Sequence, residues 1–130
     1  MIRIDGFDHA AVTVYDIAAS CEFYVRVLGG RVENFGGHRV AVHLGDQKLN
    51  LHDAATGADL VAAVPTIGAL DLCLRTATPM SAVEAHLADC GVEVELGPVE
   101  RAGANGPLLS VYIRDPDGNL IEVSNYEGGT

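Results

Sequence analysis

The stretch Asp115–Glu122, which reads DPDGNLIE, decides the fold that the sequence predicts. Its first half is turn chemistry, because proline presets φ and glycine accepts a left-handed backbone. The residues after the turn alternate, which predicts a strand with Ile121 and Val123 on one face and Glu122 on the other. A carboxylate in a short apolar strand is costly unless a cation satisfies it. We therefore expect Glu122 to belong to a metal site.

The composition describes a folded, acidic protein. The 130 residues are 48% hydrophobic, which is enough for one domain with its own core. Lys and Arg number 8 against 18 Asp and Glu, and the resulting charge of -10 repels nucleic acid and anionic membrane. The three cysteines lack CxxC spacing, and the sequence shows neither a signal peptide nor a run of membrane-spanning length. We therefore expect a cytoplasmic protein with no nucleic-acid or membrane partner.

The predicted elements fall into two similar halves, each with one strand, one helix and three further strands. The first half has strands over 7–14, 32–35, 39–44 and 48–53, with a helix that Asp16 caps. The second half has strands over 70–75, 92–99, 108–114 and 120–125, with a helix that Thr78-Pro79 opens. The order predicts an α+β fold of two tandem βαβββ modules in a single domain, 1–130. Their bounds are about 4–53 and about 69–126, and the linker is about 54–68.

Each helix is predicted to cover one face of its sheet with an apolar stripe. The stripe of the first helix is Ile17, Cys21, Tyr24 and Leu28, before Gly29-Gly30 ends the helix. The stripe of the second is Met80, Val83 and Leu87, before Cys90-Gly91. The helices are expected to pack on the sheet faces that carry Val12, Leu51, Leu72 and Ile121.

The opposite faces carry side chains that an ordinary core would avoid. Alternation places His9 and His52 there in the first half, and Asp71 and Glu122 in the corresponding strands of the second. Side by side, the two halves would form a trough lined by all four. Two imidazoles and two carboxylates suit a borderline or hard divalent cation, namely Ni, Zn, Mn, Fe or Co.

Alternatives stay open for several of these residues. Asp71 either binds the metal or caps a loop or pairs with Arg75, and Glu122 is otherwise a solvated edge carboxylate. His43 is placed behind the ligands as a supporting or structural group, and His38 and His86 are taken as surface or structural groups. The stretch 101–107 is either a loop that closes over a substrate or a hairpin connection. The candidate substrate contacts are Asn50, Arg101, Tyr112 and Arg114.

Three segments resemble the vicinal oxygen chelate superfamily, which includes glyoxalase I, extradiol dioxygenases, bleomycin-resistance proteins and fosfomycin-resistance thiol transferases. They are Asp8-His9, the helix end FYVRVLG at 23–29, and DPDGNLIE at 115–122. Two further segments, QKLNLH at 47–52 and GPVER at 97–101, are most similar to the branch called glyoxalase-domain-containing protein 5 or virulence-type proteins.

The resemblance implies a homodimer with metal sites in troughs formed by paired modules. Carried over by position, it places His9, His52, Asp71 and Glu122 at the metal. The chain departs from glyoxalase I, which has a glutamate where this sequence has His52 and a histidine where it has Asp71. The dioxygenase and fosfomycin-resistance branches also favour a histidine at Asp71. Where glyoxalase I uses a carboxylate to move a proton, this chain has the imidazole of His52, which is a possible base of different basicity.

The sequence thus favours a metal-dependent enzyme, a lyase, isomerase or dioxygenase, that acts on a small oxygenated metabolite. His9, His52 and Glu122 are the core ligands, and Asp71 is a fourth ligand or a mobile catalytic base beside Glu122. Without Asp71, two histidines and one carboxylate match the open arrangement of Fe(II) dioxygenases. The second class is a bleomycin-resistance-like binding protein, against which the 5% aromatic content counts. A ferredoxin-like regulatory domain would lack the extra strand in each half.

Overall fold

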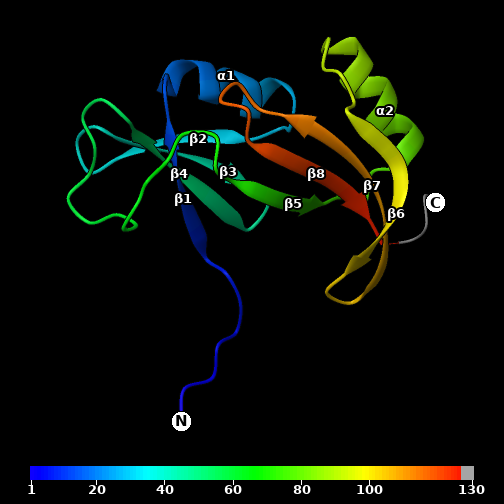
Figure 1. The fold of residues 1–130 in the computed structure, drawn as a ribbon, viewed down its shortest axis with the longest axis horizontal. Coiled ribbons are helices and arrows are strands. Elements are labelled where there is room, and N and C mark those ends of the chain that lie inside the picture. The colour runs from blue at the N-terminus through cyan, green and yellow to red at the C-terminus, as the bar shows by residue number, and fades with distance from the viewer. Residues whose placement is uncertain (127–130) are drawn as a thin grey trace. The chain divides into compact units, whose positions relative to one another are not determined.

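The computed structural model describes residues 1–126, which form two compact units that meet in sequence at Ile67 and Gly68 (Figure 1). The first unit contains β1 (His9–Val14), α1 (Ile17–Arg26), β2 (Arg31–Phe35), β3 (Arg39–Leu44) and β4 (Gln47–Asp53). The second contains β5 (Asp71–Arg75), α2 (Met80–Asp89), β6 (Leu96–Gly103), β7 (Gly106–Arg114) and β8 (Leu120–Asn125). The predicted βαβββ order, written twice, is confirmed.

The two units share one sheet topology. The strand orders are β1-β4-β3-β2 and β5-β8-β7-β6, and the first and last strands of each unit lie together in parallel. The other neighbours are antiparallel. A parallel pair needs a crossover connection between its strands, and in each unit the helix and the two middle strands supply it.

Helix α1 lies along one face of the first sheet (Figure 1). It begins after Asp16, whose Oδ1 accepts a hydrogen bond from the Ala19 amide at 3.2 Å. Of the predicted stripe, Tyr24 is buried and Ile17, Cys21 and Leu28 are half-buried. Ser20 and Phe23, which the prediction left out, are also buried on α1. It packs on the predicted sheet face, which buries Val12, Val42, Leu49 and Leu51.

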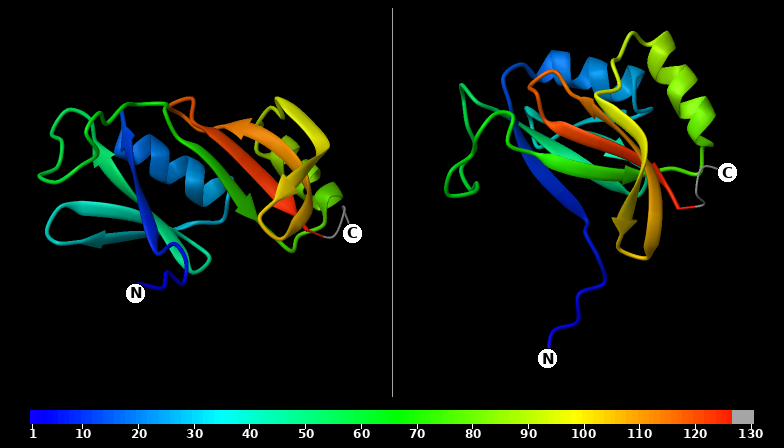
Figure 2. Two further views of the ribbon diagram at one scale, coloured as in Figure 1. Left: turned by 60° about the horizontal axis from the view of Figure 1, so that its bottom comes forward. Right: turned by 45° about the vertical axis from the view of Figure 1, so that its right-hand side comes forward.

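Helix α2 covers one face of the second sheet (Figure 2). Its buried side chains are Met80, Val83 and Leu87, as predicted. The predicted cap was wrong, because the N-cap is Pro79 and no side chain caps the helix. Asn125 Nδ2 of β8 donates instead to the Thr78 carbonyl at 2.7 Å, which ties the start of α2 to the sheet.

The strand predicted over 92–99 is displaced in the structure, since β6 begins at Leu96 and runs to Gly103. It pairs with β7 as far as Gly103 and Gly106, so residues 104 and 105 make the connection. Of the two alternatives for the stretch 101–107, the structure thus contains the hairpin. A register shift between Leu96 and Val99 interrupts the ladder.

The DPDG sequence forms the expected turn. The Gly118 amide donates to the Asp115 carbonyl at 3.0 Å, and Gly118 has a φ of 85°. The buried Asp115 carboxylate accepts hydrogen bonds from the Asp117 and Asn119 amides, each at 2.9 Å, and from Asn119 Nδ2 at 2.8 Å. Asn119 Oδ1 in turn accepts from the Leu70 amide at 2.8 Å. The turn therefore also fixes the chain where it enters β5.

Residues 54–70 contain turns and bends but no helix or strand. No disulfide joins Cys21, Cys73 and Cys90. Across residues 1–126, neither helix has the length and apolar character needed to cross a membrane.

Candidate functional site

The strand registers decide which side chains share the helix-free face of each sheet. In the first unit His9 lies opposite Lys48, and His52 lies opposite Thr13. Because directly opposite residues point to the same side, both histidines lie on the helix-free face. In the second unit Cys73 lies opposite Glu122, and Asp71 alternates onto the same face.

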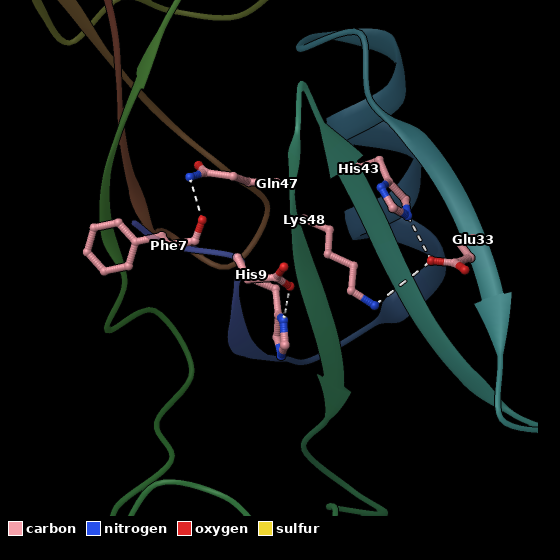
Figure 3. Close-up of polar contacts among 7 residues, drawn as sticks. Phe7, His9, Glu33, His43, Gln47 and Lys48 are labelled. Carbon is pink, nitrogen blue, oxygen red and sulfur yellow. Dashed lines mark hydrogen bonds and ion pairs between the residues drawn. The ribbon is translucent and has the colours of Figure 1, made fainter. Parts of the chain in front are cut away.

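His9 is held by its sequence neighbour. Its Nδ1 lies 2.7 Å from Asp8 Oδ1 (Figure 3), and this hydrogen bond lowers the pKa of the Asp8 carboxyl. With Nδ1 as the donor, the lone pair of Nε2 is left for another partner. Metal-binding histidines use this arrangement, because the carboxylate fixes both the tautomer and the ring orientation.

His52 shares a face with His9 but is not its neighbour. The two stand four residues apart along the parallel ladder, so their Cα atoms are separated by about 14 Å at the usual strand rise and spacing. Asn50 lies between them, opposite Ala11. It is only 8% exposed, and within residues 1–126 its Oδ1 has no hydrogen-bond partner. An unsatisfied buried acceptor there calls for a cation or a donor group.

Glu122 is the most firmly held of the predicted ligands. The Ser110 hydroxyl of β7 donates to Glu122 Oε2 at 2.6 Å. Ser124 Oγ lies 2.7 Å from Ser110 Oγ and 3.4 Å from the same carboxylate oxygen. Both serines are fully buried. The carboxylate is thus oriented by two buried hydroxyls, on the face that α2 does not cover.

Asp71 lies near Glu122 in the second sheet. Their positions differ by two residues across the β5/β8 pair, which gives a Cα separation of about 8 Å. Asp71 is exposed and makes no hydrogen bond or ion pair with another described residue, so the alternative in which it pairs with Arg75 is absent. Cys73 lies between them, 3.3 Å from Ser124 Oγ, and burial raises the pKa of its thiol.

The predicted substrate contacts on β6 and β7 divide into two groups. Arg101 Nε donates to the Tyr112 hydroxyl at 2.9 Å, and its guanidinium lies 5.5 Å from the centre of that ring. Arg114 pairs with Glu95 through two hydrogen bonds of 2.9 and 3.0 Å. The Arg114 guanidinium lowers the pKa of Glu95. The pair borders a hollow of about 340 Å³ beside Gly91–Glu93.

A cluster in the first unit was not predicted (Figure 3). Glu33 Oε1 lies 2.7 Å from His43 Nε2 and 3.9 Å from Lys48 Nζ, and the hydrogen bond to His43 is the main reason for its lowered pKa. Lys48 Nζ also lies 4.1 Å from the centre of the Phe35 ring, and the Arg39 guanidinium lies 4.5 Å from it. Alternation along each strand predicts the face on which each of these side chains lies. Which of them contact one another follows only from the pairing register of the strands.

The donor chemistry of these faces suits a divalent cation. The first unit offers imidazoles and an unsatisfied amide oxygen, and the second offers two neighbouring carboxylates. These are nitrogen and oxygen donors of the kind that Zn, Ni, Mn, Fe and Co accept. Across residues 1–126, no three His, Cys, Asp or Glu side chains gather as a set that could hold a metal ion.

Two curated proteins are similar to nearly the whole chain. The virulence protein STM3117 of Salmonella typhimurium is 46% identical over 123 residues, which cover 95% of this chain and 85% of that protein. The glyoxalase domain-containing protein RDO1 of Mycosarcoma maydis is 41% identical over 126 residues, which cover 97% of this chain and 71% of that protein.

Solved structures agree with this fold at several levels of identity. The crystal structure of STM3117 superposes with a TM-score of 0.95 at 45% identity, covering 96% of this chain and 99% of that one. Lactoylglutathione lyase from Agrobacterium tumefaciens gives 0.73 at 25% identity and covers 96% of each chain. TnmS3, an antibiotic binding protein from Streptomyces, gives 0.73 at 26% identity, covering 96% and 98%.

The family model described as the Glyoxalase/Bleomycin resistance protein/Dioxygenase superfamily matches residues 6–123. This match spans nearly all of both βαβββ units. It also includes the three segments at 8–9, 23–29 and 115–122 that first indicated the resemblance. The chain belongs to this superfamily.

Proposed function

We propose that the protein is a metal-dependent enzyme of this superfamily that acts on a small oxygenated metabolite. The ligands are drawn from His9, His52, Asp71 and Glu122, and the two histidines of one chain, about 14 Å apart at their Cα atoms, would not bind the same ion. The observation that carries the proposal is the Glu122 carboxylate, which two buried serines orient on a helix-free face. A protein gains little by fixing a carboxylate there unless the carboxylate has a partner to bind.

A bound divalent metal would supply Lewis-acid chemistry toward neighbouring substrate oxygens. The chain's own residues orient the metal ligands, take a proton and contact the substrate. Asp8 holds the His9 ring, and Ser110 holds the Glu122 carboxylate. Asp71 makes no hydrogen bond or ion pair among residues 1–126, so its carboxylate is available either to complete the ligand set or to take a proton from the substrate. Asn50 Oδ1 would accept a hydrogen bond from a substrate hydroxyl.

Single alanine substitutions at His52 and Glu122 are expected to remove most of the bound metal while the far-UV circular dichroism stays close to that of the wild type. Both side chains lie on sheet faces that carry no helix, so their loss removes donor atoms and little packing. Metal content is measured by ICP-MS on protein purified without chelator or nickel resin. His38→Ala is the control, because His38 is exposed and lies in the turn before β3.

The amount of metal that each variant loses would distinguish metal ligands from residues that only orient a ligand. Ser110→Ala should weaken metal binding by roughly tenfold and not abolish it, because outer partners orient ligands without replacing them. If His52→Ala keeps its full metal content and His9→Ala loses it, His52 leaves the ligand set. If every variant keeps the wild-type metal content, the proposal is wrong.

A second candidate function is sequestration of a small molecule without chemistry. The similarity to the antibiotic binding protein TnmS3 favours it. Tight ligand binding by protein that retains no metal would support this candidate over the enzyme. An Fe(II) dioxygenase is the nearest enzymatic alternative, and oxygen consumption with catechols by the iron-loaded protein would distinguish it.

We also propose that the protein works as a homodimer. Large apolar side chains are strongly exposed in the segments before β1 and after β4, and association would cover them. They are Ile2, Ile4, Phe7, Leu60 and Val64. Size-exclusion chromatography with light scattering should give twice the chain mass of 13.6 kDa. A monomer at all concentrations tested would contradict the proposal.

A further inference from the structure

Basic side chains gather on the helix-free face of the first unit, although the chain as a whole is acidic. The sequence has 8 Lys and Arg against 18 Asp and Glu. Arg31, Arg39 and Lys48 nevertheless alternate onto this one face, where the carboxylates beside them are Glu33 on β2 and Asp8 directly before β1. A local excess of cations on an anionic protein attracts anions and raises their concentration at that surface.

Glu33 offsets only part of the positive charge of this cluster. Its Oε1 lies 2.7 Å from His43 Nε2 but 3.9 Å from Lys48 Nζ, which is too long for a hydrogen bond. The Lys48 side chain is only 19% exposed, and its ammonium lies over the Phe35 ring. A half-buried ammonium whose ion pair is this long, and which makes no hydrogen bond among residues 1–126, gains from a second anion.

Arg39 also contacts the Phe35 ring. Its guanidinium is 4.5 Å from the centre of the Phe35 ring and makes no hydrogen bond or ion pair within residues 1–126. Stacking on an aromatic face holds the planar group while leaving its five donors to other partners. A guanidinium in this state is suited to bidentate recognition of an oxyanion.

We propose that this face recognises an oxyanion on the small molecule that the protein binds. Lys48 and Arg39 hold the anionic group, and Phe35 holds the two cations in place. The inference rests on the proposed function, since it names the class of substrate: an oxygenated metabolite that carries a carboxylate or a phosphate, in addition to the oxygens that the unsatisfied Asn50 amide would contact.

The experiment compares matched pairs of probes that differ in one charge. Catechol and 3,4-dihydroxybenzoate test the carboxylate, and glycerol and glycerol 3-phosphate test the phosphate. Isothermal titration calorimetry is done on the full chain, with and without added Mn²⁺. The anionic member of at least one pair should bind about tenfold more tightly than the neutral member, and added salt should reduce that preference.

Substitutions of Lys48 and Arg39 test whether these two side chains cause the preference for the anionic probe. Lys48→Gln and Arg39→Gln should each remove most of the preference for the anion. Arg26→Gln should not, because Arg26 pairs with Glu22 on α1, away from this face. Arg39 is exposed, so Arg39→Gln remains a fair test even if Lys48→Gln disturbs the fold.

The results separate this inference from the metal proposal. A protein that binds Mn²⁺ but binds both members of each pair equally would overturn the inference and leave the metal proposal standing. A preference for the anion in protein that binds no metal would support the inference alone. A preference that persists in the Lys48→Gln and Arg39→Gln variants would also overturn it.

Discussion

Gly97→Ala is expected to destabilise the second unit more than any other single change considered for this chain. A Cβ at residue 97 would lie 2.4 Å from the Ser110 carbonyl oxygen and 3.0 Å from Val111 Cα, and neither backbone atom can rotate away. Gly97 also has a φ of 114°, which side-chain-bearing residues rarely adopt. Backbone strain and overpacking together should lower the free energy of unfolding by about 4 kcal/mol.

Gly106→Ala is the matched control. Gly106 has a φ of 132° in the same hairpin, but a Cβ there would meet no atom within 4 Å. Gly106→Ala should introduce backbone strain without a clash. It should therefore lower the free energy of unfolding by about 2 kcal/mol less than Gly97→Ala does. Urea unfolding of the full chain measures both, and hydrogen exchange at the β7 amides locates the loss. Equal losses from the two variants would show that the approach to Ser110 is not a clash.

Asp115→Ala is expected to give the second largest loss of stability, about 3 kcal/mol. The substitution removes a buried carboxylate that accepts from two backbone amides and from the Asn119 side chain. Asn119 is fully buried, so its freed Nδ2 cannot turn to water without opening the turn. Because Asn119 also binds the Leu70 amide, the start of β5 should loosen with it.

Asp46→Ala provides the comparison for Asp115→Ala. Asp46 is an exposed aspartate in the turn between β3 and β4, and its loss should change the free energy of unfolding by less than about 0.5 kcal/mol. Thermal or urea unfolding measures both variants, and hydrogen exchange at the Leu70 and Leu120 amides reports on the turn. A loss for Asp115→Ala as small as that for Asp46→Ala would show that water replaces the carboxylate.

The element order and the sheet faces could be predicted because each depends on local chemistry. The DPDG turn is specified by residues that are adjacent in sequence. Alternation in β4 correctly separated buried Leu49 and Leu51 from the helix-free side of the strand. The doubled βαβββ order could be predicted because the same succession of element types occurs twice along the sequence.

The errors and omissions arise where side chains meet partners that are distant in sequence. Ser20 was overlooked in the buried stripe of α1, because a hydroxyl does not stand out in an apolar period. Ser110 was missed because only the β7/β8 register places its hydroxyl beside Glu122. The Glu33, His43 and Lys48 cluster likewise spans three strands. The ligand set itself stays a prediction, and the metal measurements test it.

The anchoring of Leu70 to the DPDG turn has a consequence for how such chains can vary. The Leu70 amide binds Asn119 and its carbonyl accepts from the Leu120 amide, so the second unit fixes its own first strand. The segment before it, 54–67, contributes no strand to either ladder. Doubling the length of that connection would cost only about 0.6 kcal/mol of closure entropy. Insertions and fusions are therefore best tolerated between the units, where neither hydrogen-bond ladder has to be rebuilt.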